Sequence, residues 1–198
     1  MLIISQVAQG KSKILLAAAY RSAIILVGAQ AAHDVTEMST FENHDFKWRE
    51  TYFVLFDSAR RPTLDQVKHR LARLNSRFEL SPGEADEAGR FDSISLRSPQ
   101  DYAAMDISYV SGEEVSEQVD ELQRDMKGTV DASDRPKFNQ LGQCDAKFDI
   151  LHFEQVSEED TDEEDGEMLD PSALLAVMDA LVELTHGVGI DPASGSLM

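Results

Sequence analysis

The spacing of apolar side chains predicts four main β-strands. Thr51–Phe56 is a continuous run of β-favouring residues, which is typical of a central strand buried on both faces. Apolar and polar residues alternate over Phe91–Arg97 and over Met105–Val110, which predicts an antiparallel pair of half-buried strands. The apolar residues of Lys147–Val156 predict a fourth strand.

Two amphipathic helices are predicted from apolar positions at helical spacing. The first runs from Leu64 to Leu74 and follows a capping box that begins at Thr63. The second follows a capping box predicted to begin at Ser111 and ends near Gly128. Each helix has one narrow apolar face and therefore packs through that face alone.

A third helix is expected over Ser172–Thr185, which is apolar on three sides. Asp170 is its expected cap, and Pro171 fits the first helical position because its missing N–H has no partner there. Gly187 suits the left-handed position that follows many helices. This helix should be the most buried of the three.

The order of these elements predicts an α+β fold with a mostly antiparallel sheet and helices on one face. The specific expectation is a ferredoxin-like (split βαβ) sheet with an added C-terminal helix. Arg77–Leu80 and Val188–Asp191 are expected as short strands. Glu84–Arg90 and Thr129–Pro136 are expected as a polar loop and a polar linker.

The charge balance narrows the classes of partner. The 198 residues include 37 acidic and 18 basic side chains, which gives a net charge of −19. Nucleic acid and anionic membranes repel such a chain, so neither is an expected partner. No apolar run reaches the roughly 20 residues of a membrane-spanning helix. We therefore expect a soluble, cytoplasmic protein with no cofactor.

The acidic residues are all found after residue 33, and this change in composition predicts a boundary. Residues 1–37 are expected to be a weakly packed extension, and residues 38–198 a single acidic α+β domain. Alternatives for the extension are an amphipathic helix over Ile14–Val27, an acid-poor transit peptide, or a mis-called start before Met38. A signal peptide over residues 1–31 would mean export, although Arg21 interrupts its apolar stretch.

The extension also contains a partial phosphate-binding motif. Gly10, Lys11 and Ser12 match the last three positions of a P-loop, and Ser5 replaces its first glycine. Asp57 follows an apolar strand, as a magnesium-binding aspartate does in nucleotide-binding enzymes. A P-loop-like enzyme is therefore an alternative hypothesis, against a chance Gly-Lys-Ser sequence.

The most acidic segment is Glu158–Glu167, with eight acids in ten residues. Like charges repel one another, so residues 157–168 are expected to form a mobile, solvated loop. The segment fails the EF-hand pattern because Gly166 arrives one position late and Pro171 replaces the final glutamate. Weak divalent-cation binding by the loop is the second alternative function, with no defined metal site.

The sequence predicts no catalytic residue. Cys144 is the single cysteine, which excludes an internal disulfide framework, and its nearest histidine in sequence is His152. No family signature surrounds this pair, and a buried, inert thiol is the favoured interpretation. His186, in the last turn of the third predicted helix, is interpreted as structural.

Basic side chains gather at the first predicted helix. At about 100° per residue, Arg70, Arg73 and Arg77 share one flank beside the apolar stripe. This surface is interpreted as a docking patch for an acidic partner, either another protein or a second copy of the chain; an ordinary solvated helix face is the alternative. The predicted interaction residues are Arg60, Arg61, Lys68, Arg70, Arg73 and Arg77.

The segment Leu181–Pro192 resembles a feature of uncharacterised bacterial α+β domains. In those domains an apolar helix ends in Thr-x-Gly and is followed by a short strand and an Asp-Pro turn; Thr185, Gly187 and Asp191 match these positions. The resemblance implies a bacterial source and a packing motif, without an activity. The sequence as a whole favours a non-enzymatic protein-interaction module.

Overall fold

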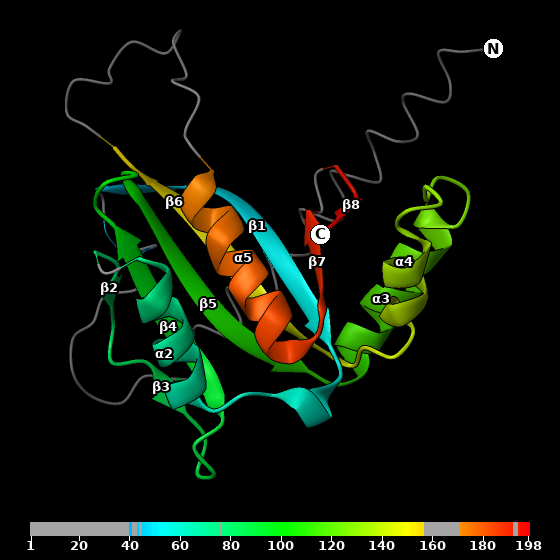
Figure 1. The fold of residues 1–198 in the computed structure, drawn as a ribbon, viewed down its shortest axis with the longest axis horizontal. Helices are drawn as coiled ribbons and strands as arrows, with labels where there is room; N and C mark the ends of the chain where they lie inside the picture. The colour runs from blue at the N-terminus through cyan, green and yellow to red at the C-terminus, as the bar shows by residue number, and fades with distance from the viewer. Residues whose placement is uncertain (1–39, 41–42, 44, 76, 157–170, 192–193) are drawn as a thin grey trace, which may run out of the picture. The chain divides into compact units, whose positions relative to one another are not determined.

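The computed structural model describes residues 40, 43, 45–75, 77–156, 171–191 and 194–198. They form an open sheet of eight strands with the order β2-β4-β5-β6-β1-β7-β8, and β3 also pairs with β4 (Figure 1). Every strand pair in this part of the chain is antiparallel. The predicted α+β class with an antiparallel sheet is therefore confirmed.

The strands are β1 (Phe46–Phe56), β2 (Glu79–Leu80), β3 (Glu84–Ala85), β4 (Phe91–Ser98), β5 (Ala103–Ser111), β6 (Ala146–Gln155), β7 (Val188–Asp191) and β8 (Ser196–Leu197). The helices are η2 (Ser58–Arg60, a 3-10 turn), α2 (Leu64–Leu74), α3 (Glu113–Met126), α4 (Arg135–Leu141) and α5 (Ser172–Thr185). None of these helices is long and apolar enough to cross a membrane.

β1 lies inside the sheet, between β6 and β7. Its pairing with β6 runs from Phe46 opposite Gln155 to Phe56 opposite Ala146, with an irregularity near Arg49. Residues 53–56 are all buried, so consecutive side chains on both faces of the strand are removed from water. The central strand predicted over Thr51–Phe56 is confirmed, although it begins five residues earlier.

The main core lies between the sheet and the layer formed by α2 and α5 (Figure 1). Phe148 is at its centre, with its ring 4.7 Å from that of Phe56 and 5.1 Å from that of Phe91. α5 is the most buried helix, as predicted, because its apolar residues occur on several sides. Its buried residues are Ala173, Leu174, Val177, Met178, Ala180, Leu181 and Thr185.

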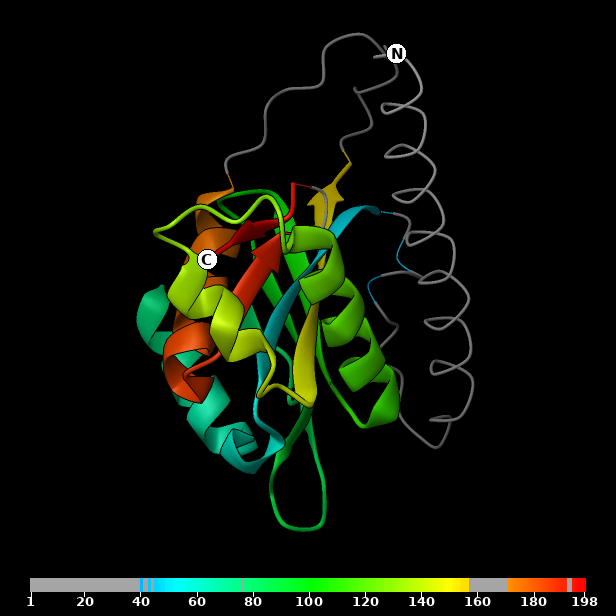
Figure 2. The ribbon, with the colours of Figure 1, turned by 90° about the vertical axis from the view of Figure 1, so that its right-hand side faces the viewer.

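α3 lies on the opposite side of the sheet from α2 and α5 (Figure 2). Lys147 alternates with the core residue Phe148 along β6, and its Nζ donates to Oε1 of Gln118 in α3 at 3.0 Å. The expectation that helices share one face therefore holds for α2 and α5 and is wrong for α3. The narrow stripe of α3 buries only Val115 and Val119.

The ferredoxin-like arrangement is not confirmed. A split βαβ unit needs a crossover between parallel strands. Here β5 and β6 are direct antiparallel neighbours, paired from Ala103 opposite Glu154 to Ser111 opposite Ala146. The segment that contains α3 and α4 therefore returns the chain to the adjacent position instead of crossing over another strand.

Helix ends confirm one predicted cap and correct others. The capping box of Thr63 and Gln66 is present. Ser111 is no cap, because it is the last residue of β5; Gly112, with a φ of 116°, occupies the N-cap position of α3. Pro171 is the N-cap of α5 and not its first helical residue.

The prediction for Gly187 is also wrong. His186 takes the left-handed conformation after α5, with a φ of 51°, and Gly187 does not have a positive φ. Gly187 is required for another reason. A Cβ atom there would lie 2.5 Å from the carbonyl oxygen of Leu55 and 2.9 Å from Oγ1 of Thr185.

The sequence did not predict three short elements, because a helix or strand of few residues has too few apolar positions to show a period. α4 (Arg135–Leu141) begins inside the expected linker, with Pro136 in its first turn. β3 occupies the start of the expected loop Glu84–Arg90, and β8 was not expected at all. The extension over residues 1–37, its boundary with the domain and the acidic loop 157–168 lie outside the described residues.

Replacing Gly187 with alanine should destabilise the domain. The added methyl group meets backbone and buried side chains that cannot move aside, so we expect a loss of about 1–3 kcal/mol in the free energy of unfolding. Gly128→Ala is the matched control, because its Cβ would meet no atom within 4 Å. Urea unfolding of the two variants measures the difference, and equal midpoints would contradict the prediction.

Candidate functional site

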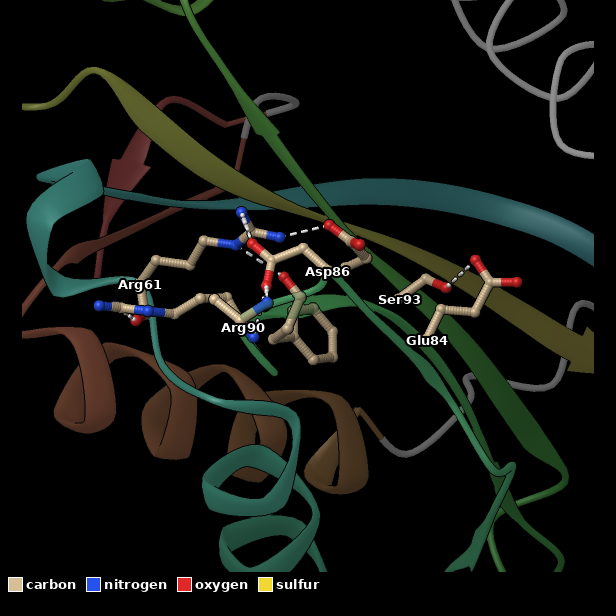
Figure 3. Close-up of polar contacts among 8 residues, drawn as sticks. Arg61, Glu84, Asp86, Arg90 and Ser93 are labelled. Atoms are coloured by element: carbon tan, nitrogen blue, oxygen red, sulfur yellow. Dashed lines mark hydrogen bonds and ion pairs between the residues drawn. The ribbon is translucent and has the colours of Figure 1, made fainter.

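Arg61 is a structural clamp and not part of an open basic surface. Its Nε donates to the carbonyl oxygen of Phe91 at 2.9 Å, and its guanidinium forms ion pairs with Asp86 and Asp92 (Figure 3). The same guanidinium lies 3.9 Å from the centroid of the Tyr109 ring. With 15% of its side chain exposed, Arg61 holds the segment before α2 against β4 and β5.

The segment between β3 and β4 that meets Arg61 is ordered by its own hydrogen bonds. Oδ1 of Asp86 accepts the backbone N–H groups of Ala88 and Arg90 at 2.9 Å and 2.8 Å. Glu84 accepts a hydrogen bond from the hydroxyl of Ser93 at 3.3 Å (Figure 3). These bonds fix the Asp86 carboxylate in the position where Arg61 reaches it.

Two further cations of the predicted patch also have partners within the domain. Nζ of Lys68 donates to the carbonyl oxygen of Pro82 at 2.8 Å. Arg70 forms an ion pair with Glu183, which joins α2 to α5. Together with Arg61, these residues connect elements of the fold and have less capacity to contact another molecule.

Arg73 and Arg77 remain available. Both are exposed, and in the described part of the chain neither has a side-chain hydrogen bond or ion pair. Arg73 lies in the last turn of α2, whereas Arg77 lies beyond it, because the helix ends at Leu74 and Asn75 is extended. The prediction that Arg77 shares a helical flank with Arg70 and Arg73 is therefore wrong. Arg60 is exposed as well, but it precedes α2 and so lies at the other end of the helix. The six predicted residues therefore do not form one continuous surface.

Arg60 instead borders a polar cavity of about 310 Å³ at the end of β1. Three segments that are distant in sequence meet there: the turn that follows β1 and contains η2, the end of α4 with the loop before β6, and the residue that follows α5. The cavity brings two sequence-predicted residues together with four that the sequence did not select. The lining residues are Asp57, Arg60, Gln140, Gln143, Cys144 and His186.

Hydrogen bonds between these segments hold the walls of the cavity. Asp57 accepts the N–H of Ala59 at 2.9 Å and thereby caps η2. Asp145 accepts the N–H of Ser58 at 2.6 Å and its hydroxyl at 2.8 Å. The side-chain amide of Gln140 donates to the carbonyl oxygen of His186, which joins α4 to the end of α5.

Cys144 is poorly suited to act as a nucleophile. Burial raises the pKa of its thiol to about 11, and the carboxylates of Asp145 and Asp57 add to this effect, while Arg60 opposes it. The thiol is therefore protonated at neutral pH, and a protonated thiol is a weak nucleophile. His152 cannot activate it, because residues 146–152 alone extend about 20 Å along β6.

His152 lies on the core face of β6 and has an unsatisfied nitrogen. The residue is 4% exposed, and its Nδ1 has no hydrogen-bond partner among the described residues; Oε1 of Glu50 lies 3.8 Å from it. Burial lowers the pKa of His152, although the carboxylates of Glu50 and Glu154 oppose the shift. Burial and a hydrogen bond to Glu50 raise the pKa of the nearby Tyr52 phenol.

The nucleotide hypothesis gains no support from Asp57. Its carboxylate caps η2, and both neighbours of β1 are antiparallel to it. Gly10, Lys11 and Ser12 lie outside the described residues. No group of three or more metal-ligating side chains occurs within the described ranges, and Glu158–Glu167 lies outside them.

Comparisons with known proteins identify no relative. No protein-family model, curated protein or solved structure matches the chain significantly.

Replacing Arg61 with alanine should destabilise the domain by about 2 kcal/mol. The change removes a buried packing surface and leaves Asp86 and Asp92 without their cation. Arg73→Ala is the control: it removes the same charge from an exposed site and should change the free energy of unfolding by about 0.5 kcal/mol or less. Equal effects of the two substitutions in urea unfolding would show that Arg61 is no clamp.

His152 should make the domain less stable in acid. The folded state holds its pKa below the unfolded value of 6.5, so the unfolded chain binds more protons as pH falls. This contribution to stability is complete above pH 6.5 and is lost as pH falls towards the lower folded pKa. Unfolding measured between pH 5 and 7 should show a weaker pH dependence for His152→Gln than for wild type. The exposed His69→Gln variant should behave as wild type, and identical slopes for all three proteins would contradict the assignment.

Proposed function

We propose that the domain is a non-enzymatic protein-interaction module that binds an acidic partner through Arg73 and Arg77. The observation that carries the proposal is the separation of the basic residues into two groups. Arg61, Lys68 and Arg70 bind to other parts of the domain, whereas Arg73 and Arg77 are exposed at the end of α2.

The net charge of the whole chain limits where an acidic partner can approach the surface. In a protein of net charge −19, most of the surface repels an acidic partner, and exposed cations define where such a partner can approach. Charge complementarity of this kind favours orientation and rapid association. Arginine is also enriched in protein interfaces, because its planar guanidinium binds a carboxylate through two hydrogen bonds.

The protonated thiol of Cys144 supports a binding function in preference to a catalytic one. The thiol of Cys144 has a pKa raised to about 11, the reverse of the shift that activates a catalytic cysteine. The carboxylates beside it, Asp57 and Asp145, accept hydrogen bonds from the backbone of η2 and help to hold the fold.

Reversing the charge of Arg73 and Arg77 should abolish partner binding. The full-length wild type and the double variant Arg73→Glu/Arg77→Glu are immobilised and exposed to an extract of the source organism. Bound proteins are quantified, and the leading partner is then titrated in purified form. We expect at least tenfold weaker binding by the variant, and weaker binding of wild type at high salt.

The matched control is Arg124→Glu/Lys127→Glu at the end of α3. It makes the same change in net charge at two exposed residues. Equal loss of binding in both variants would mean that only net charge matters, and unaltered binding in the Arg73/Arg77 variant would overturn the proposal. Sedimentation of the purified proteins distinguishes a second copy of the chain from a different partner.

A further inference from the structure

The cavity at the end of β1 has no part in the proposed interaction, yet its lining is suited to a ligand. Its volume of about 310 Å³ is at the lower end of the range for ligand pockets, which is roughly 300–1,000 Å³. All of its lining side chains are polar or, in Cys144, a thiol. A ligand there would be small and would be recognised through polar groups.

The walls are fixed before any ligand arrives. Asp145 ties η2 to the start of β6 through Ser58, and its own N–H donates to the carbonyl oxygen of Phe56 at 3.2 Å. Gln140 ties α4 to His186. A pocket that is already held in place loses little freedom when it binds, which favours affinity for a small molecule.

Several polar groups of the cavity lining take no part in the hydrogen bonds that hold its walls. In the described part of the chain, the side chains of Arg60, Gln143 and His186 have no hydrogen bond or ion pair. Asp57 uses Oδ1 to cap η2, and Oδ2 has no bond to a described residue. The open lining therefore offers one cation, one carboxylate oxygen, an amide and an imidazole.

Asp57 and Arg60 present separate charges of opposite sign. They lie three residues apart at the two ends of η2 and do not form an ion pair with each other. Both border the same cavity as the thiol of Cys144. The cavity thus has a negative and a positive pole, with the thiol within reach of both.

We propose that this cavity binds a free amino acid in its zwitterionic form. The ammonium group binds the Asp57 carboxylate, and the ligand carboxylate binds the Arg60 guanidinium, where two parallel hydrogen bonds are possible. A ligand with a single charge would pair with only one of the two side chains and would therefore bind more weakly than a zwitterion. Gln143 and His186 border the ligand and are available for further hydrogen bonds.

The test begins with ligand-observed NMR on the full-length protein and an equimolar mixture of the twenty amino acids. Any amino acid that binds is then compared with its N-acetyl derivative, which lacks the ammonium charge, and with its methyl ester, which lacks the carboxylate. We expect each blocked form to bind at least tenfold more weakly. Absence of binding by all twenty amino acids, or equal binding of the blocked forms, would overturn the proposal.

Two conservative variants assign the poles. Asp57→Asn keeps an oxygen that can cap η2 and removes the charge, and Arg60→Gln removes the cation. Each should weaken binding of the zwitterion at least tenfold. The control Arg124→Gln/Asp125→Asn neutralises a neighbouring pair of exposed charges on α3 and should leave binding unchanged. If the Asp57 and Arg60 variants bind as wild type does, the assignment is wrong.

Cys144 supplies a second measurement because it is the only cysteine in the chain. A ligand between Asp57 and Arg60 should slow the reaction of this thiol with a disulfide reagent, and the slowing should disappear in both variants. Protection that persists in the variants would contradict the site. The Arg73→Glu/Arg77→Glu variant should bind the amino acid normally, so failure of the proposed interaction and failure of this site can be distinguished.

Discussion

The antiparallel pairing of β1 with β6 is the contact on which the rest of the domain depends. Phe56 and Phe148 meet across it at the centre of the core, and α5 covers the face on which they lie. One end of the pair leads into Asp57 and Cys144, which line the cavity, and near the other end Glu50 is opposite the buried His152. A shift of register by one residue would move alternate side chains to the wrong face and separate both groups.

Features that depend on neighbouring residues were predictable from the sequence. The β-favouring run Thr51–Phe56, the capping box at Thr63 and the apolar helix Ser172–Thr185 each involve residues within a single strand or helix. The cap at Gly112 was not predictable in this way, because it depends on β5 continuing to Ser111 in order to pair with Ala146. The order of the strands could not be predicted from the sequence either. The helical spacing of α3 does not show that the chain returns to pair β6 directly with β5.

In the candidate sites, too, the sequence identified residue types, and their contacts with distant residues appeared only in the structure. The sequence identified six basic residues near α2, and two of them, Arg73 and Arg77, are exposed without a side-chain partner among the described residues. It could not show that Asp86, 25 residues later, would bind Arg61, or that Glu183 would bind Arg70. Asp57 and Arg60 were each selected for a different hypothesis, and only the fold places them in one cavity with Gln143 and His186.

The two borders of the sheet have a consequence for behaviour at high concentration. A long, flat border strand offers unpaired N–H and C=O groups on which another chain can build, and this is a common origin of fibrous aggregation. Here β8 on one side, and β2 and β3 on the other, are only two residues long, and both β2 and β3 begin with a glutamate. β6 is paired on both sides along almost its whole length, whereas β7 covers β1 only over Phe53–Leu55. Among the described residues, the domain therefore keeps β6, which lies at the centre of the sheet, away from any border where a strand of another molecule could add.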